Sequence, residues 1–247
     1  MNSLINLIRT YWIRFVSESI WFLERVMFYP KLARSISKSS LVTEDSVIFD
    51  VGTNRGQSIS FFLKLFPQCT IYGFEPSRSV FPILRAKFSG NTNIKLFEMA
   101  LGSAPGESVF YEHPLDETST LSPPNSDSKW QKTKNRLLFI GKNNQFTETI
   151  VPVTTVDEFF EFNNLSKIDL LKIDVEGFEY DVLLGATNTL TKGAIKAIQI
   201  ERHVDDLRLD RTSVIRNLLK AFGFEIRISI KHSFGNFYED LYVKNLN

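Results

Sequence analysis

The residues best suited to chemistry lie in the segment VIFDVGTNRGQS, residues 47–58. An apolar run there reaches Asp50 and is followed by Gly52, Asn54 and Gly56, after which apolar residues recur at helical spacing. Open α/β sheets bind ligands where a strand gives way to a helix at its carboxyl end. We expect Gly52 to let a ligand approach the main chain and Gly56 to let the following helix pack close to the strand. The segment therefore predicts a ligand-binding turn.

Two carboxylates indicate which kind of ligand this turn binds. The glycine spacing matches neither the dinucleotide fingerprint G-x-G-x-x-G nor the P-loop, because no Lys-Ser or Lys-Thr pair follows it. Asp50 would repel a pyrophosphate, but it can bind an ammonium group or lie near a cation. Glu75 ends the next strand-like run, 25 residues beyond Asp50, where a carboxylate can accept both hydroxyls of a ribose. Together they predict a nucleoside joined to an amino-acid end, which is the form of S-adenosylmethionine.

Three segments resemble the signature blocks of a known family. VIFDVGTNRGQS, FEPS and LLKIDVEGFEYDVLLGA are similar to those of the FkbM-type methyltransferases, a branch of the class I S-adenosylmethionine-dependent enzymes. The resemblance covers about residues 47–243 and is most specific in LLKIDVEGFE. One departure is Thr53, where the family usually has Ala.

The resemblance implies both a fold and a reaction. The fold is α/β, a Rossmann-like seven-stranded, mostly parallel sheet with helices on both faces and an antiparallel last strand. The reaction is O-methyl transfer to a hydroxyl of a sugar, a glycan or another small natural product. With the strand-end pattern it leads us to assign S-adenosylmethionine contacts to Asp50, Gly52, Asn54, Gly56, Glu75, Ala100 and Asp174.

Four ionisable residues follow two later strand-like runs, Asp174 and Glu176 in KIDVEG and Glu201 and His203 in IQIERH. In such a sheet these strands flank the first one on the side away from Glu75, so their ends face the methyl acceptor. His203 is the first candidate for the general base, because an imidazole titrates near neutral pH. Asp174, which borders the cofactor or orients the acceptor, and Glu201 are the other catalytic candidates.

The same four residues also allow a metal-dependent alternative. Asp174, Glu176, Glu201 and His203 can surround a divalent ion that lowers the pKa of the acceptor. Carboxylates with one imidazole suit magnesium or manganese better than zinc. His113 and His232 lack neighbouring carboxylates in the sequence, and we expect both at the surface.

Apolar runs that alternate with helical patterns position these residues and favour a parallel sheet covered by helices. The expected strands are residues 47–51, 70–74, 94–100, 170–174, 197–201, 224–230 and 240–244, and the expected helices are residues 57–66, 80–88, 176–184 and 212–221. Residues 107–112 and 147–153 look extended and are expected to pair as a hairpin. Between them lies a polar insertion, about residues 113–147, which we interpret as a lid over the substrate pocket.

Residues 1–40 are expected to form an arm outside the methyltransferase domain, which spans residues 41–247. Leu4, Ile8, Tyr11, Phe15 and Phe22 recur at helical spacing and predict an amphipathic helix that breaks near Pro30. Charged residues interrupt the arm, which argues against a membrane span and against a secretory signal. Its apolar face can pack on the core, on a second subunit or on a membrane surface. The sequence SISKSS, residues 35–40, is expected to be a linker.

Composition restricts the partners and the cellular compartment that we expect for the protein. The 247 residues include 29 basic and 28 acidic side chains, a balance that gives no reason to expect nucleic acid as a partner. Cys69 is the single cysteine, which excludes an internal disulfide and a Cys-based zinc site and suits a reducing compartment. We therefore expect a cytoplasmic protein, either free or peripheral on the inner face of the membrane.

Two other functions remain open at this point. One is an NAD(P)-dependent oxidoreductase on a similar fold, against which Asp50 and the missing G-x-G-x-x-G argue. The other is a non-catalytic module that binds a membrane or a partner through its arm and insertion. The acceptor, the need for a metal and the oligomeric state are not determined by the sequence.

Overall fold

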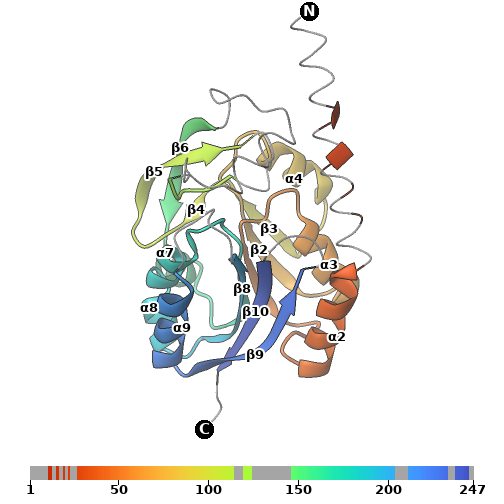
Figure 1. Cartoon of the computed structure of the whole chain (residues 1–247), viewed down its shortest axis with the longest axis vertical. Helices are drawn as coiled ribbons and strands as arrows, with labels where there is room; N and C mark the ends of the chain where they lie inside the picture. The colour runs from red at the N-terminus through yellow and green to blue at the C-terminus, as the bar shows by residue number, and fades with distance from the viewer. Residues whose placement is uncertain are drawn as a thin grey trace, which may run out of the picture.

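Seven strands form the main sheet of the computed structural model, which describes residues 11, 12, 15, 16, 19, 22, 27–113, 119–123, 146–203, 211–232 and 237–244, without the side chains of residues 38 and 203. The strand order is β3-β2-β1-β7-β8-β10-β9. The bounds are β1 Val47–Val51, β2 Thr70–Phe74, β3 Ile94–Phe97, β7 Ile168–Ile173, β8 Ile195–His203, β9 Phe224–Lys231 and β10 Phe237–Lys244. Strand β10 runs antiparallel to both of its neighbours, so the predicted sheet with its antiparallel last strand is confirmed (Figure 1).

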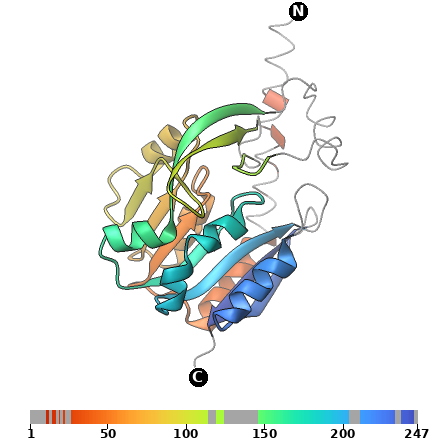
Figure 2. The ribbon, with the colours of Figure 1, turned by 90° about the vertical axis from the view of Figure 1, so that its left-hand side faces the viewer.

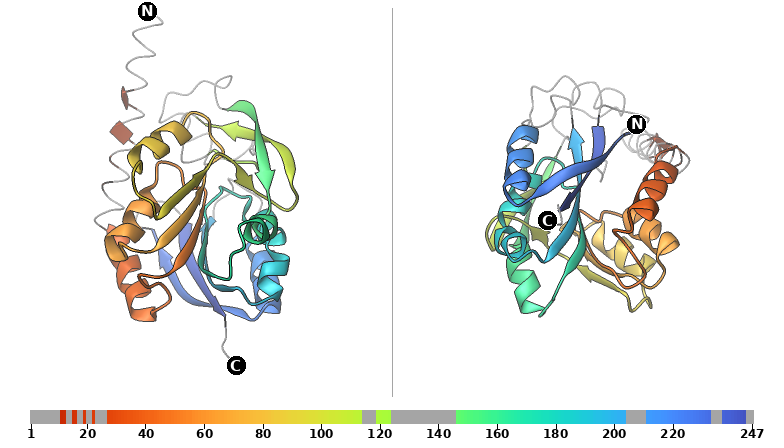
Figure 3. Two further views of the ribbon diagram at one scale, coloured as in Figure 1. Left: turned by 180° about the vertical axis from the view of Figure 1, so that it is seen from behind. Right: turned by 90° about the horizontal axis from the view of Figure 1, so that it is seen from below.

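Helices cover both faces of this sheet (Figure 2). One face carries α2 Tyr29–Ser39, α3 Gln57–Leu65 and α4 Phe81–Lys87, and the other carries α6 Val156–Phe162, α7 Glu179–Leu184, α8 Thr187–Thr191 and α9 Thr212–Ala221. Every residue of β7 is buried, which is the reason that the central strands read as continuous apolar runs instead of alternating ones. Viewed from below, the sheet lies between the two helical layers (Figure 3).

The first of these helices, α2, belongs to the core. Leu32 and Ile36 are buried in the same apolar cluster as Ile48 of β1 and Ile59 of α3. Residues 35–39 therefore form the end of α2, and the expectation of a linker there is wrong. Pro30 lies at the first turn of α2, where its missing N–H costs no helical hydrogen bond. Among the described residues, no helix combines the length and the apolar composition that a bilayer crossing requires.

A second, three-stranded sheet has the order β4-β6-β5. Its strands are β4 Ala100–Leu101, β5 Gly106–Glu112 and β6 Thr147–Thr154. Strands β5 and β6 pair antiparallel, which confirms the predicted hairpin. The predicted third strand, residues 94–100, is divided, because β3 ends at Phe97 and Ala100 instead pairs with Val153 of β6.

The described part of the insertion is attached to the loop that follows β7. The hydroxyl of Thr120 donates to the carbonyl oxygens of Val175 and Glu176 at 3.0 and 2.9 Å. The hydroxyl of Ser122 donates to the carbonyl oxygen of Gly177 at 2.8 Å. Most of the predicted lid, residues 114–118 and 124–145, lies outside the described residues, so the lid stays a prediction.

The turn after β1 depends on two glycines with positive φ. A Cβ at Gly52, where φ is 82°, would lie 1.8 Å from the carbonyl oxygen of Asp174. Gly52 therefore admits the protein's own main chain, the end of β7, at the place where we expected a ligand. A Cβ at Gly56 would lie 2.3 Å from the ring of Phe88 and 2.9 Å from Leu84. Gly56 thus lets α3 approach α4 closely, in addition to the packing of α3 on β1.

We expect Gly52→Ala to destabilise the protein by more than about 3 kcal/mol, because strain at positive φ and the clash with Asp174 each cost about 1–3 kcal/mol. Gly90→Ala is the matched control, since Gly90 also has a positive φ, 87°, but a Cβ added there would meet nothing within 4 Å. The control should lose only the free energy of placing a Cβ at positive φ, about 1–2 kcal/mol. Urea unfolding measures both, and equal losses would contradict the close approach.

Candidate active site

The carboxyl ends of β2, β1 and β7 meet at one edge of the sheet, because β1 pairs with the other two in parallel register. The backbone N–H groups of Gly52 and Thr53 both donate to the carbonyl oxygen of Phe74 at 3.1 Å. On the other side, the N–H of Asp174 donates to the carbonyl oxygen of Val51 at 3.0 Å. The glycine turn is therefore held between the strand ends that carry Glu75 and Asp174, as the sequence predicts.

Glu75 is a buried carboxylate whose orientation is fixed by main-chain donors. The N–H of Asn54 donates to Oε2 at 2.8 Å, and the N–H of Ser77 donates to Oε1 at 2.9 Å. Asn54 reaches Glu75 because its φ is 49°, in the left-handed region, which Asn tolerates better than most residues. These contacts place both predicted cofactor residues, Asn54 and Glu75, at one point of the edge.

Asp50 is completely buried and already has a cationic partner. Its Oδ1 lies 3.4 Å from Nζ of Lys172 on the adjacent strand β7, and Ser58 of α3 donates to its Oδ2 at 2.5 Å. Lys172 also donates to Oδ2 of Asp174 at 3.1 Å. The structure thus places the protein's own ammonium group where the sequence suggested that of a ligand, and Asp50 supports the site from below.

The charges of this group perturb each other. Burial acts to lower the pKa of Lys172, but Asp174, Asp50 and Glu239 outweigh burial and hold this pKa well above its usual value. Lys172 is therefore a permanent cation at neutral pH. Burial raises the pKa of Asp50, and the attraction of Lys172 and the hydrogen bond from Ser58 offset this only in part.

The sequence analysis did not assign a role to Lys172, although this residue lies in the segment LLKIDVEGFE. A lysine inside an otherwise apolar strand could have indicated a buried ion pair, since a lysine is almost never fully buried without a partner. Its partner Asp174 keeps a third of its side chain exposed. Asp174 is thus the member of the group that a ligand can reach.

The end of β8 carries the predicted residues Glu201 and His203. Glu201 lies directly opposite Glu239 of β10, and one ligand atom from each of Glu201, His232 and Glu239 lies within 4.8 Å of the others. The backbone of His203 pairs with Phe237, but its side chain lies outside the described part of the chain. The role of His203 as a base therefore stays a prediction.

Both histidines that were expected at the surface are buried, so those two predictions are wrong. His113 is 4% exposed and His232 is 7% exposed. Of the carboxylates near His232, Glu201 is 31 residues away on β8 and Glu239 is seven residues away on β10, so strand pairing brings the three together.

The predicted metal quartet is not brought together by the described residues. Asp174 is bound by Lys172, and neither Asp174 nor Glu176 belongs to the group of metal-type ligands that approach within 4.8 Å of one another. Glu176 has a φ of 54° and Gly177 a φ of 96°, so helix α7 begins at Glu179 and not at residue 176 as expected. Glu176 therefore lies in the loop before α7 and not in a helix.

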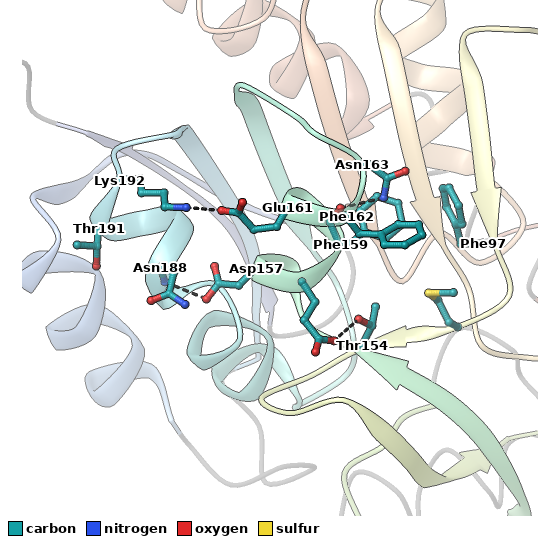
Figure 4. Close-up of a pocket in the computed structure, with 12 residues that line it drawn as sticks. Phe97, Thr154, Asp157, Phe159, Glu161, Phe162, Asn163, Asn188, Thr191 and Lys192 are labelled. Atoms are coloured by element: carbon teal, nitrogen blue, oxygen red, sulfur yellow. Dashed lines mark hydrogen bonds and ion pairs between the residues drawn. The ribbon is translucent and has the colours of Figure 1, made fainter.

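A cavity of about 780 Å³ lies elsewhere, between the end of β3 and helices α6 and α8 (Figure 4). None of the predicted site residues lines it. Its polar side chains are already paired, since Asp157 accepts hydrogen bonds from the N–H groups of Asn188 and Thr189 and Glu161 binds Lys192. We therefore do not place the cofactor in this cavity.

The sequence of this chain is similar to those of known methyltransferases. Residues 50–226 match the model of the methyltransferase FkbM domain. The 2-O-methyltransferase NoeI of Sinorhizobium fredii is 29% identical over 62% of this chain and 63% of its own length. The hexuronic acid methyltransferase AglP of Haloferax volcanii is 27% identical over 66% of this chain and 59% of its own length. The chain thus spans about three fifths of these relatives.

A solved structure supports the fold. The crystal structure of the methyltransferase FkbM from Methylobacillus flagellatus KT covers 82% of this chain with a TM-score of 0.55, while the match takes in 44% of that protein. Sequence identity between the two is 14%, so the likeness concerns the arrangement of strands and helices alone.

We expect Lys172→Met to destabilise the protein by about 3–5 kcal/mol, because it leaves Asp50 buried without its cation. The double variant Asp50→Asn/Lys172→Met should lose less than the sum of the single losses, with a coupling of about 1–3 kcal/mol. Lys167→Met is the control, since Lys167 pairs with Asp169 but is 43% exposed, and such pairs contribute about 0–1 kcal/mol. Urea unfolding compares these three variants with Asp50→Asn alone, and additive losses would contradict a buried ion pair.

Proposed function

The chain belongs to the FkbM methyltransferase family, and on that premise we propose that it transfers a methyl group from S-adenosylmethionine to a hydroxyl of a sugar or glycan. The observation that carries the proposal is the oriented carboxylate of Glu75 beside the glycine turn. Strand β1, which leads into this turn, lies between the strands that end at Glu75 and Asp174. A carboxylate at the end of the second strand is the group that binds ribose hydroxyls in this class of sheet.

The described residues suit this cofactor in a specific way. Glu75 would accept the ribose hydroxyls, and the backbone of residues 52–56 would lie along the nucleoside. Asp174, a third exposed and beside Lys172, would face the amino-acid end. Asp50 would hold Lys172 in place instead of touching the cofactor. Ala100 pairs with β6 in the second sheet, so its predicted contact stays a proposal.

When bound, S-adenosylmethionine supplies a methyl group that is already activated for displacement. The task of the protein is then to hold the acceptor oxygen in line, an effect that can lower the barrier by about 7–11 kcal/mol. The end of β8 is the part of the edge that can do this, because it lies beyond β7 from the glycine turn. Glu201 there offers carboxylate oxygens to sugar hydroxyls, and His203 is the proposed base.

The choice of a sugar acceptor is supported by the names of two relatives, a 2-O-methyltransferase and a hexuronic acid methyltransferase. It is also supported by the carboxylates of Glu201 near the end of β8 and Glu239 near the start of β10, since carboxylates accept hydrogen bonds from hydroxyl groups. A polar, acidic acceptor side suits a polyhydroxyl compound better than it suits an apolar compound.

We further propose a contact role for the N-terminal arm in the cytoplasm. Tyr11, Phe15 and Phe22 are exposed at positions that share one helical face. Such a face can lie on a membrane surface or against a second copy of the chain. Co-sedimentation with anionic vesicles tests membrane binding, and sedimentation velocity of the protein alone tests self-association. A monomer that does not bind vesicles would contradict both roles.

Glu75→Gln should weaken S-adenosylmethionine binding about tenfold to a hundredfold, because a hydrogen bond to a charged group contributes about 1.5–3 kcal/mol. Glu98→Gln is the control, since Glu98 is exposed just beyond β3 and should leave affinity unchanged. Isothermal titration calorimetry measures both, and thermal unfolding confirms that the variants are folded. Unchanged affinity in Glu75→Gln would remove the ribose assignment.

The reaction itself is tested with methyl-labelled S-adenosylmethionine and three acceptor classes: uronic acids, neutral hexose oligosaccharides and an extract of small molecules. We expect label to appear as a methyl ether on a sugar hydroxyl. His203→Ala should lower this turnover by about 10²–10⁴-fold and leave cofactor affinity intact. Label on protein or nucleic acid instead would overturn the sugar assignment, and undiminished turnover would disqualify His203.

A further inference from the structure

Glu201, His232 and Glu239 form a three-residue cluster at the far end of the acceptor side, which we call the β8–β10 cluster. Glu201 and Glu239 face each other across the antiparallel pair β8 and β10. His232 directly follows β9, and its N–H donates to the carbonyl oxygen of Phe237 at 3.1 Å. The three strands lie side by side in the sheet (Figure 1). One ligand atom from each residue lies within 4.8 Å of the others.

The two carboxylates of this cluster create an electrostatic cost. Like charges directly opposite each other on paired strands are destabilising, and Glu239 is buried, where screening by water is weak. Lys172 is close enough for its charge to interact with that of Glu239, but its direct contacts are with Asp50 and Asp174. The cluster therefore brings carboxylate oxygens from two strands and an imidazole within reach of one ion.

A neighbouring side chain supplies a second, independent sign of a ligand. Gln199 lies two residues before Glu201 on β8 and is 1% exposed. Its Nε2 donates to Oε2 of Glu239 at 3.0 Å, which holds its carboxamide next to the cluster. Its Oε1 is buried and has no hydrogen-bond partner among the described residues, although a buried amide oxygen normally binds a donor or a cation. This oxygen is a further potential ligand.

The imidazole of His232 is held rigidly in place. It stacks on Phe28 with ring centroids 3.8 Å apart and contacts Phe237 at 4.2 Å. Its Nε2 lies 3.8 Å from Oε1 of Glu239, which is too long for a direct hydrogen bond. Two ligand atoms that each lie about 2.0–2.2 Å from one metal ion are separated by roughly 3–4 Å. The separation of 3.8 Å between His232 Nε2 and Glu239 Oε1 lies within that range.

We propose that the β8–β10 cluster binds a divalent metal ion of the manganese type, with Glu201, His232 and Glu239 as protein ligands. Carboxylates suit manganese and magnesium, and an imidazole shifts the preference toward the transition metals. An ion here would accept the oxygen of an acceptor hydroxyl and stabilise its deprotonated form. That role depends on the proposed function, whereas binding of the ion does not. The site differs from the quartet that the sequence suggested, because it uses His232 and Glu239.

For the test, the full chain is first freed of metal with EDTA and then titrated with MnCl₂. Binding is measured by calorimetry and by the electron paramagnetic resonance signal of free Mn²⁺. We expect binding of a single ion, with affinity lowered at least tenfold in Glu239→Gln and in His232→Asn. Glu225→Gln is the matched control, because Glu225 is an exposed carboxylate on β9 and should bind Mn²⁺ as the wild type does. MgCl₂ should bind more weakly than MnCl₂.

Glu201→Gln provides a second test if a variant at a buried position fails to fold. Glu201 is only partly buried, and circular dichroism shows whether each variant keeps its fold. Failure of the wild type to bind Mn²⁺ would overturn the proposal. Equal binding by the wild type and the folded variants would overturn it too. Since no acceptor or cofactor is present, either result is independent of methyl transfer.

Discussion

The candidate active site depends on one buried ion pair, between Lys172 of β7 and Asp50 of β1. A charge this deeply buried is tolerated only when a partner and further hydrogen bonds compensate its lost hydration. Ser58 and Asp174 supply these contacts. The pair therefore links helix α3, the first strand and the end of β7, and it fixes the two strand ends relative to each other directly beneath the glycine turn.

This constraint separates the edge of the sheet into two sides. On one side, the turn and Glu75 are organised by main-chain donors, so they present a rigid carboxylate to a nucleoside. On the other side, Asp174, Glu201 and Glu239 come from successive strands of the sheet, where we propose that the acceptor binds. A methyl donor and an acceptor need to meet in line, and the ion pair sets the spacing between the strands that hold them.

The acceptor side includes parts of the chain outside the family match at residues 50–226. Phe28, at the start of α2, stacks on His232, and Glu239 lies on the last strand. Within the match, Thr120 and Ser122 of the insertion donate hydrogen bonds to the loop after β7. The match thus includes the glycine turn and Glu75, while segments near both ends of the chain contribute to the proposed acceptor side. A division of this kind lets one reaction serve different acceptors.

The sequence by itself determined the sheet, the hairpin, the positions of Asp50 and Glu75 at strand ends and the family, because strand periodicity and glycine turns are encoded locally. It misjudged α2, the end of β3 and the histidines. Only the tertiary structure showed that Lys172 takes the ammonium position beside Asp50, and that His232 and Glu239 join Glu201. Lys172 is far from Asp50 in the chain, and Glu201 is far from His232 and Glu239. Their contacts arise only when strand order and register bring them together, so no local pattern can carry that information.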